Sequence, residues 1–154
     1  MERRQIITEL KKFFKIQELI CPHILGRWGE QSWRFFHTAF LETLLIIRRD
    51  ILQSGMTCNN YHVGGTMSQR GIRCNLCQMT RDATSKNQLA TLGHPIGAAG
   101  DFTVTGMTAQ EARSRISANA DKLPYPIRLE DGVNWLHFDV LDTMNGQKIT
   151  LFKP

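Results

Sequence analysis

Hydrophobic positions in the first third of the chain repeat with the period of an α-helix. One amphipathic stretch covers residues 5–14, and a stronger apolar stripe with three- and four-residue steps covers residues 30–52. The stripe consists of Trp33, Phe36, Phe40, Leu44, Ile47 and Ile51. The pattern predicts two helices whose apolar faces lie in the core, the second ending near Gly55.

Residues 56–92 lose this periodicity and are rich in Gly, Asn, Ser, Thr and Arg. They predict a long irregular segment with one or two short strands or turns. Loops of this length in a compact domain usually carry function.

After residue 100 the pattern changes to short β-type runs. Strands are expected at 101–105, 126–130, 134–142 and 148–152. A capping box of Thr108 and Glu111 predicts a helix over residues 109–120. Asp131-Gly132 and Asn145-Gly146 are hairpin signals between consecutive strands.

The expected architecture is therefore α+β, with N-terminal helices followed by an antiparallel sheet that has one helix packed on it. With 154 residues, we expect a single domain over 1–154. It would comprise a helical lead-in at 1–55 and a sheet region at 56–154.

Composition adds limits on the environment. The 19 basic and 14 acidic residues leave a net charge of +5, which suits an acidic polymer, although so small an excess favours a merely solubilising surface. No apolar run is long enough to span a bilayer, and the N-terminus does not read as a secretory leader. We expect a chain made in the cytoplasm with its four cysteines reduced.

The stretch GHPIGAAGDF at residues 93–102 carries two possible metal ligands, His94 and Asp101. A third, His137, falls in the middle of a predicted strand. Catalytic zinc typically has three protein ligands of these types and one open position. Each of these residues alone is more often structural, but their combination and spacing predict a zinc centre.

Two motifs carry a family resemblance. H-x-x-G-x-A-x-D followed by W-x-H-x-D resembles the zinc D-alanyl-D-alanine carboxypeptidases and L-alanyl-D-glutamate endopeptidases, peptidoglycan peptidases that share their fold with the hedgehog signalling domain. The matching residues are His94, Gly97, Ala99, Asp101, Trp135, His137 and Asp139. The segment 68–75 and the helical lead-in ending near Arg49 resemble a bacterial and prophage subgroup.

The resemblance implies that His94, Asp101 and His137 are the zinc ligands. It also implies that Arg73 lies beside the metal and binds substrate oxygens, a role suited to a bidentate guanidinium. Asp139 is either an outer partner of His137 or a surface carboxylate. Trp135 is expected to pack in the core behind His137.

The sequence departs from the family at two positions. Many members place an acidic general base three residues before the last histidine, where this chain has Asn134. The nearest carboxylates are Glu130 and Asp131, and Glu130 is favoured because turn chemistry already explains Asp131. Leu92 stands where the family often has a serine.

The implied function is a zinc-dependent peptidase that hydrolyses an amide bond next to a D-amino acid in peptidoglycan stem peptides. An endolysin-like or wall-remodelling enzyme of prophage or bacterial origin would reach the wall by phage-type release, with no nucleic-acid partner and no membrane segment. One alternative is a non-catalytic relative that binds the wall or signals.

A basic zinc-knuckle nucleic-acid binder is the other alternative. In it, Cys58 and His62 would complete a site with Cys74 and Cys77. The chain has only one C-x-x-C motif, whereas such zinc sites usually have two. This favours the interpretation that Cys74 and Cys77 are two reduced thiols in a loop beside the predicted zinc centre.

Overall fold

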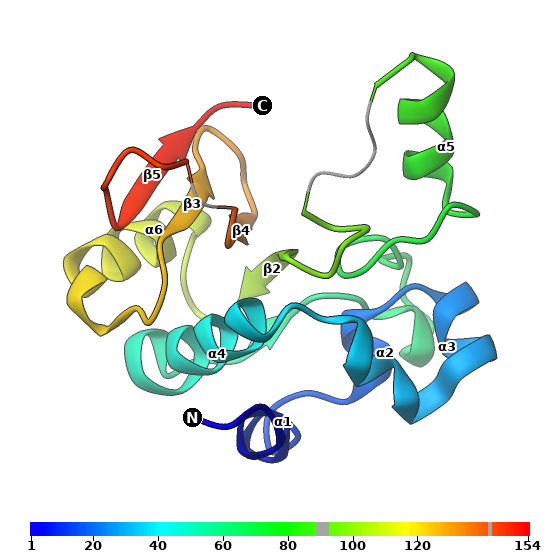
Figure 1. Cartoon of the computed structure of the whole chain (residues 1–154), viewed down its shortest axis with the longest axis horizontal. Coiled ribbons are helices and arrows are strands. Elements are labelled where there is room, and N and C mark those ends of the chain that lie inside the picture. Colours follow the sequence, from blue (N-terminus) through cyan, green and yellow to red (C-terminus); the bar gives the residue numbers. More distant parts are fainter. Residues whose placement is uncertain (89–92, 142) are drawn as a thin grey trace.

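The computed structural model describes residues 1–88, 93–141 and 143–154. It confirms the mixed α+β class, with most helices in the first half and a five-stranded sheet (Figure 1). Leu92 lies outside the described residues. So does Asp142, which is the last residue of the strand predicted at 134–142.

The helices are short. The α-helices are α1 (Arg3–Leu10), α2 (Ile16–Leu19), α3 (Pro22–Trp28), α4 (Thr38–Ile46), α5 (Gln78–Ser85) and α6 (Ala109–Ala118). There are also three 3₁₀-helices, η1 (Gly29–Phe35), η3 (Tyr61–Val63) and η4 (Ala120–Lys122), and one π-helix, η2 (Ile47–Leu52), in the described residues. None of the helices in the described parts of the chain is long and apolar enough to cross a membrane.

The single helix predicted over residues 30–52 is wrong. The stretch divides into the 3₁₀ turns of η1, the α-helix α4 and the π-helical η2. Phe36 is extended, and the His37 N–H donates to the Gly97 carbonyl at 2.9 Å. The His37 N–H therefore bonds to the loop that carries His94 and does not form the backbone hydrogen bond that would continue a helix. The helix also ends before Gly55, because Gln53 takes the left-handed conformation with φ 52°.

The irregular segment contains a helix that the sequence pattern did not predict. Residues 56–92 include the short strand β1 (Met56–Thr57), which was expected, and also α5. α5 is a polar helix with no buried residue, and its only apolar residues, Met79 and Ala83, form too short a stripe to mark a packed helix. By contrast, α6 begins with the predicted capping box, in which Thr108 and Glu111 bond each other's backbone N–H.

The sheet has the order β1-β2-β4-β3-β5. Its longer strands are β2 (Ala99–Val104), β3 (Ile127–Glu130), β4 (Leu136–Asp139) and β5 (Ile149–Phe152). β4 lies between β2 and β3, antiparallel to both, so the predicted hairpin at Asp131-Gly132 is confirmed.

The hairpin predicted at Asn145-Gly146 is wrong, and the sheet is not purely antiparallel. β5 pairs with β3, in parallel, and not with β4. Both edges of β4 are already occupied by β2 and β3, so β5 adds to the free edge of β3. Gly146 still has φ 74°, so a turn is present there but does not join neighbouring strands.

Aromatic rings fill the space between α4 and one face of the sheet. Phe40 of α4 stacks on Phe138 with ring centroids 5.2 Å apart, and Phe102 stacks on Phe138 at 5.6 Å. Gly100 lies beneath these rings, since a Cβ there would fall 2.8 Å from Phe102 and 3.1 Å from Phe40. Neither ring can withdraw from a close-packed core without leaving a void. The opposite face of the sheet is left for polar side chains.

This packing predicts that Gly100→Ala lowers the free energy of unfolding by about 1–3 kcal/mol, because the added methyl group overpacks the ring cluster. Urea unfolding followed by circular dichroism measures the change. Gly26→Ala is the matched control: no atom lies within 4 Å of its added Cβ, and alanine favours the α3 helix by about 0.5–1 kcal/mol. Equal stability of the two variants would contradict the packing argument.

Candidate metal centre

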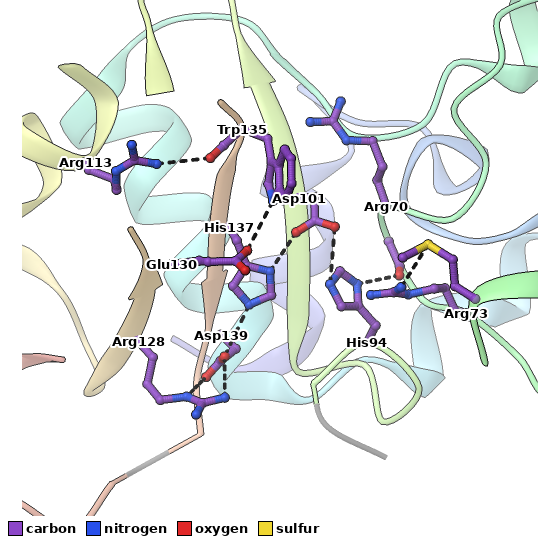
Figure 2. A network of polar contacts seen from close by, with 12 residues as sticks. Arg70, Arg73, His94, Asp101, Arg113, Arg128, Glu130, Trp135, His137 and Asp139 are labelled. Carbon is purple, nitrogen blue, oxygen red and sulfur yellow. Dashed lines mark hydrogen bonds and ion pairs between the residues drawn. The ribbon is translucent and has the colours of Figure 1, made fainter. Parts of the chain in front are cut away.

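The polar face of the sheet brings two of the predicted ligands together through strand register. Asp101 of β2 pairs with His137 of β4, and paired residues in antiparallel strands project from the same face. Leu129 of β3 pairs with Phe138, so continuing this register sets Glu130 alongside His137. Figure 2 shows these side chains in one row across the sheet.

His94 comes from the loop that precedes β2. A tight turn holds this loop, with the Gly97 N–H bonded to the His94 carbonyl and the Ala98 N–H bonded to the Gly93 carbonyl. Gly93 (φ 69°) and Gly97 (φ 70°) both need the left-handed region. A Cβ on Gly97 would also lie 2.3 Å from the Phe35 carbonyl oxygen. The turn therefore packs against Phe35 and His37, where the chain is not helical, just before α4. This packing directs His94 toward Asp101.

The three side chains converge within a small volume. His94 Nε2 lies 3.4 Å from Asp101 Oδ2, and His137 Nδ1 lies 2.6 Å from Asp101 Oδ1. One donor atom from each residue lies within 4.8 Å of the other two. Donors at about 2.0–2.1 Å from a tetrahedral zinc ion stand about 3.3 Å apart, close to the His94–Asp101 distance. The set could hold a metal ion.

Both histidines also have the orientation of metal ligands. The Gly71 carbonyl can only accept, so His94 Nδ1 donates to it at 2.9 Å, which leaves the Nε2 lone pair of a neutral ring facing Asp101. His137 Nε2 lies 3.3 Å from an Asp139 oxygen, which leaves Nδ1 facing Asp101. Holding the outer ring nitrogen with an acceptor is the usual way in which proteins orient ligating histidines.

Burial and hydrogen bonding separate the pKa values of the cluster. Burial lowers the pKa of His94, opposed by its contact with Asp101. Burial would also lower the pKa of His137, but bonds to Asp101 and Asp139 raise it to about 9. Burial would raise the pKa of Asp101, but both histidines hold it well below its usual range. Asp101 is thus an anion that requires a positive charge beside it.

Asp139 is an outer partner of His137 and not a surface carboxylate, since it is only 1% exposed. Arg128 grips it with two bonds, of 2.9 and 2.8 Å, and the Leu141 N–H adds a third. Burial would raise the pKa of Asp139, but His137 and Arg128 lower it overall. A charged, fixed Asp139 therefore determines the orientation of the His137 ring.

Asn59 anchors the segment that supports the site from the other side, and sequence analysis missed it. It is 1% exposed, donates to the Ile20 carbonyl at 3.1 Å and accepts from the Arg70 N–H at 2.9 Å. The next groups along this segment bind the site directly: the Arg70 carbonyl accepts from the Asp101 N–H, and the Gly71 carbonyl from His94. A polar residue in a polar stretch gives no sequence signal of burial.

Arg73 lies within electrostatic reach of both His94 and Asp101 (Figure 2). Burial lowers its pKa, with Asp101 opposing the change. Within the part of the chain that the structure describes, its guanidinium forms no ion pair, and its one side-chain hydrogen bond goes to Met79 Sδ at 3.1 Å. A half-buried guanidinium without a carboxylate partner is available to an anionic group of a ligand.

The two candidate bases differ in their surroundings. Asp131 lies 3.7 Å from Arg113, a buried arginine of α6 that also donates to the Val133 and Trp135 carbonyls. Glu130 accepts from Trp135 Nε1 at 3.2 Å through one oxygen. Trp135 is 37% exposed, so the expectation that it packs in the core is wrong. Its indole orients Glu130 instead.

Two cavities adjoin the cluster. One of about 280 Å³ is lined by Asp101, Trp135 and Arg70 among others. Another of about 310 Å³ is lined by Arg73, Trp28 and Pro95 among others. A larger cavity of about 610 Å³ beside α1 contains none of the candidate residues. The first of these cavities reaches Asp101, whereas the second is lined by Arg73 and by Pro95, the residue after His94.

A second group of four donors could also bind a metal ion: Cys21, His23, Cys74 and Cys77. The alternative that Cys58 and His62 complete a site with the C-x-x-C pair is wrong for the described residues. Cys58 is fully buried, where burial raises its thiol pKa, and the His62 ring stands edge-on to Tyr61. Neither belongs to the four-donor group.

Comparisons of the chain with protein families, with curated proteins and with solved structures find no match.

The anchoring of residues 70–71 predicts that Asn59→Ala lowers the free energy of unfolding by about 2–4 kcal/mol. The Arg70 N–H would lose its buried partner, at about 1–3 kcal/mol, whereas the Ile20 carbonyl would lose one of two donors and keep the Tyr61 hydroxyl, at about 0.5–1.5 kcal/mol. Urea unfolding measures the loss. Asn119→Ala removes one exposed bond at the end of α6 and should cost less than about 1 kcal/mol. A loss no larger in Asn59→Ala than in this control would contradict the anchoring role.

Proposed function

We propose that this protein is a zinc-dependent peptidase that hydrolyses an amide bond next to a D-amino acid in peptidoglycan stem peptides. The observation that carries the proposal is the convergence of His94, Asp101 and His137 with both outer imidazole nitrogens held by acceptors. Three such ligands, with one vertex left for water or substrate, typify catalytic zinc. The motif resemblance supplies the substrate class.

Zinc held by these three residues would supply Lewis acidity and would lower the pKa of a bound water molecule toward neutrality. The chain supplies the proton transfer. Glu130, beside His137 in the register of the sheet, accepts the proton of the attacking water and returns it to the leaving amine. Its bond to Trp135 holds one carboxylate oxygen and leaves the other for this transfer.

Arg73 is the proposed electrophilic partner. Its guanidinium lacks an ion-pair partner in the described regions and stands beside His94 (Figure 2). A charge held in this way, without reorganisation, stabilises the oxygen anion that develops during amide hydrolysis or binds a substrate carboxylate. The cavity lined by Asp101 and Trp135 and the cavity lined by Arg73 are the proposed places for the stem peptide.

The metal and the activity are tested together. The zinc-loaded protein should release new amino termini from purified peptidoglycan, and His94→Ala and His137→Ala should each reduce the rate by more than about 100-fold. Loss of an outer partner alone usually costs 10–100-fold, so the loss of a ligand costs more. His37→Ala is the control, because His37 is exposed and lies outside the cluster.

Two results would count against this proposal. If wild type and all three variants release amino termini at the same rate, these residues are not the catalytic ligands. If the wild type binds zinc through the cluster but releases no amino termini, the non-catalytic relative is favoured.

The assignment of the general base has its own test. Glu130→Gln should lower kcat by about 10²–10⁴-fold while bound zinc is retained, since the amide keeps an acceptor for Trp135 but cannot take a proton. Asp131→Asn is the control and should leave kcat nearly unchanged, because Asp131 faces Arg113. The opposite ranking in a steady-state assay would transfer the role to Asp131.

A further inference from the structure

The four-donor group lies apart from the proposed active centre and joins two distant chain segments. Cys21 and His23 flank Pro22 at the start of α3, whereas Cys74 and Cys77 form a C-x-x-C turn before α5. The Cys77 N–H closes that turn on the Cys74 carbonyl at 3.1 Å. Cys21 and Cys77 are buried, Cys74 is partly exposed and His23 is exposed.

The spacing of the donors matches a tetrahedral zinc site. Cys74 Sγ and Cys77 Sγ are 3.9 Å apart, and His23 Nδ1 lies 3.4 and 3.6 Å from them. Zinc–sulfur bonds of about 2.3 Å and zinc–nitrogen bonds of about 2.0–2.1 Å give tetrahedral edges of about 3.8 Å between sulfurs and about 3.6 Å between sulfur and nitrogen. Cys21 completes the group within 4.8 Å.

We propose that Cys21, His23, Cys74 and Cys77 bind a structural zinc ion. Three thiolates and one imidazole fill all four vertices, which leaves none for water or substrate, and soft thiolate donors select zinc over magnesium or calcium. The site holds the fold and has no catalytic role. This inference does not depend on the proposed peptidase activity.

The backbone on either side of the donors shows what the ion would stabilise. Ile20 and Ile72 form a parallel bridge, in which the Ile72 N–H donates to Leu19 and the Cys21 N–H donates to Ile72. Gly71 lies so close to the end of α2 that a Cβ on it would lie 2.0 Å from the Leu19 carbonyl oxygen. A single bridge of this kind holds two chain segments together only weakly. The zinc ion would join the same two segments a second time, through Cys21 and His23 on one and Cys74 and Cys77 on the other.

Metal release by thiol modification tests the proposal on the full chain. An organomercurial that caps thiolates should release about one equivalent of zinc from the wild type, detected with a chromophoric chelator. Cys74→Ser and His23→Ala should lose most of this mercurial-released zinc. Cys58→Ala, which removes a buried cysteine outside the group, should retain it.

The same assay separates this site from the proposed catalytic one. His94→Ala should still release about one equivalent of zinc on mercurial treatment, whether or not the protein is a peptidase. Cobalt substitution gives a second readout, because thiolate ligation adds strong near-ultraviolet charge-transfer absorption that His and Asp ligands lack. Wild-type protein that releases no zinc with the mercurial and lacks this absorption in its cobalt form would overturn the proposal.

Discussion

The buried carboxylate of Asp101 is the group on which the polar face of the sheet depends. An ionised carboxylate taken out of water needs hydrogen bonds and a positive charge close by. Here His137, whose pKa is raised to about 9, supplies both at 2.6 Å, and His94 Nε2 lies 3.4 Å away with its lone pair facing the carboxylate. The surrounding residues keep both rings turned toward that anion.

That orientation comes from two supports on opposite sides. On the sheet, Asp139 holds His137 and is itself fixed by the fork of Arg128. On the other side, the Gly71 carbonyl holds His94, and the Asn59 side chain anchors the neighbouring Arg70 N–H. Because Asn59 also donates to the Ile20 carbonyl, this second support rests on the N-terminal helical segment.

Sequence patterns predicted the parts of this arrangement that depend on local chemistry. The α+β class, the four longer strands and the capped helix α6 follow from periodicity and capping, and the motif spacing named the three residues that converge. The hydrophobic stripe over 30–52 misled because Phe36 keeps the apolar period although its backbone is extended and the next N–H, of His37, bonds Gly97 instead of continuing a helix. Local periodicity carries no information about such a long-range bond.

Contacts between distant residues account for the other failures. The partners of the C-x-x-C pair, Cys21 and His23, lie some fifty residues upstream, and nothing in their spacing marks them. The pairing of β5 with β3 depends on which sheet edge is free, which is a property of the assembled sheet. Arg128 and Asn59 look like ordinary surface residues until burial gives each a fixed partner.

The two donor groups differ in a way that fits different roles. His94, Asp101 and His137 offer one negative charge, so a divalent ion bound there keeps a net positive charge and an open vertex, as Lewis acid chemistry requires. The three thiolates and His23 would overcompensate the same ion and close its coordination, which suits a structural role. Residues 70–74 run from one group to the other. The backbone that carries Gly71 and Arg73 is thus the link between the two donor groups.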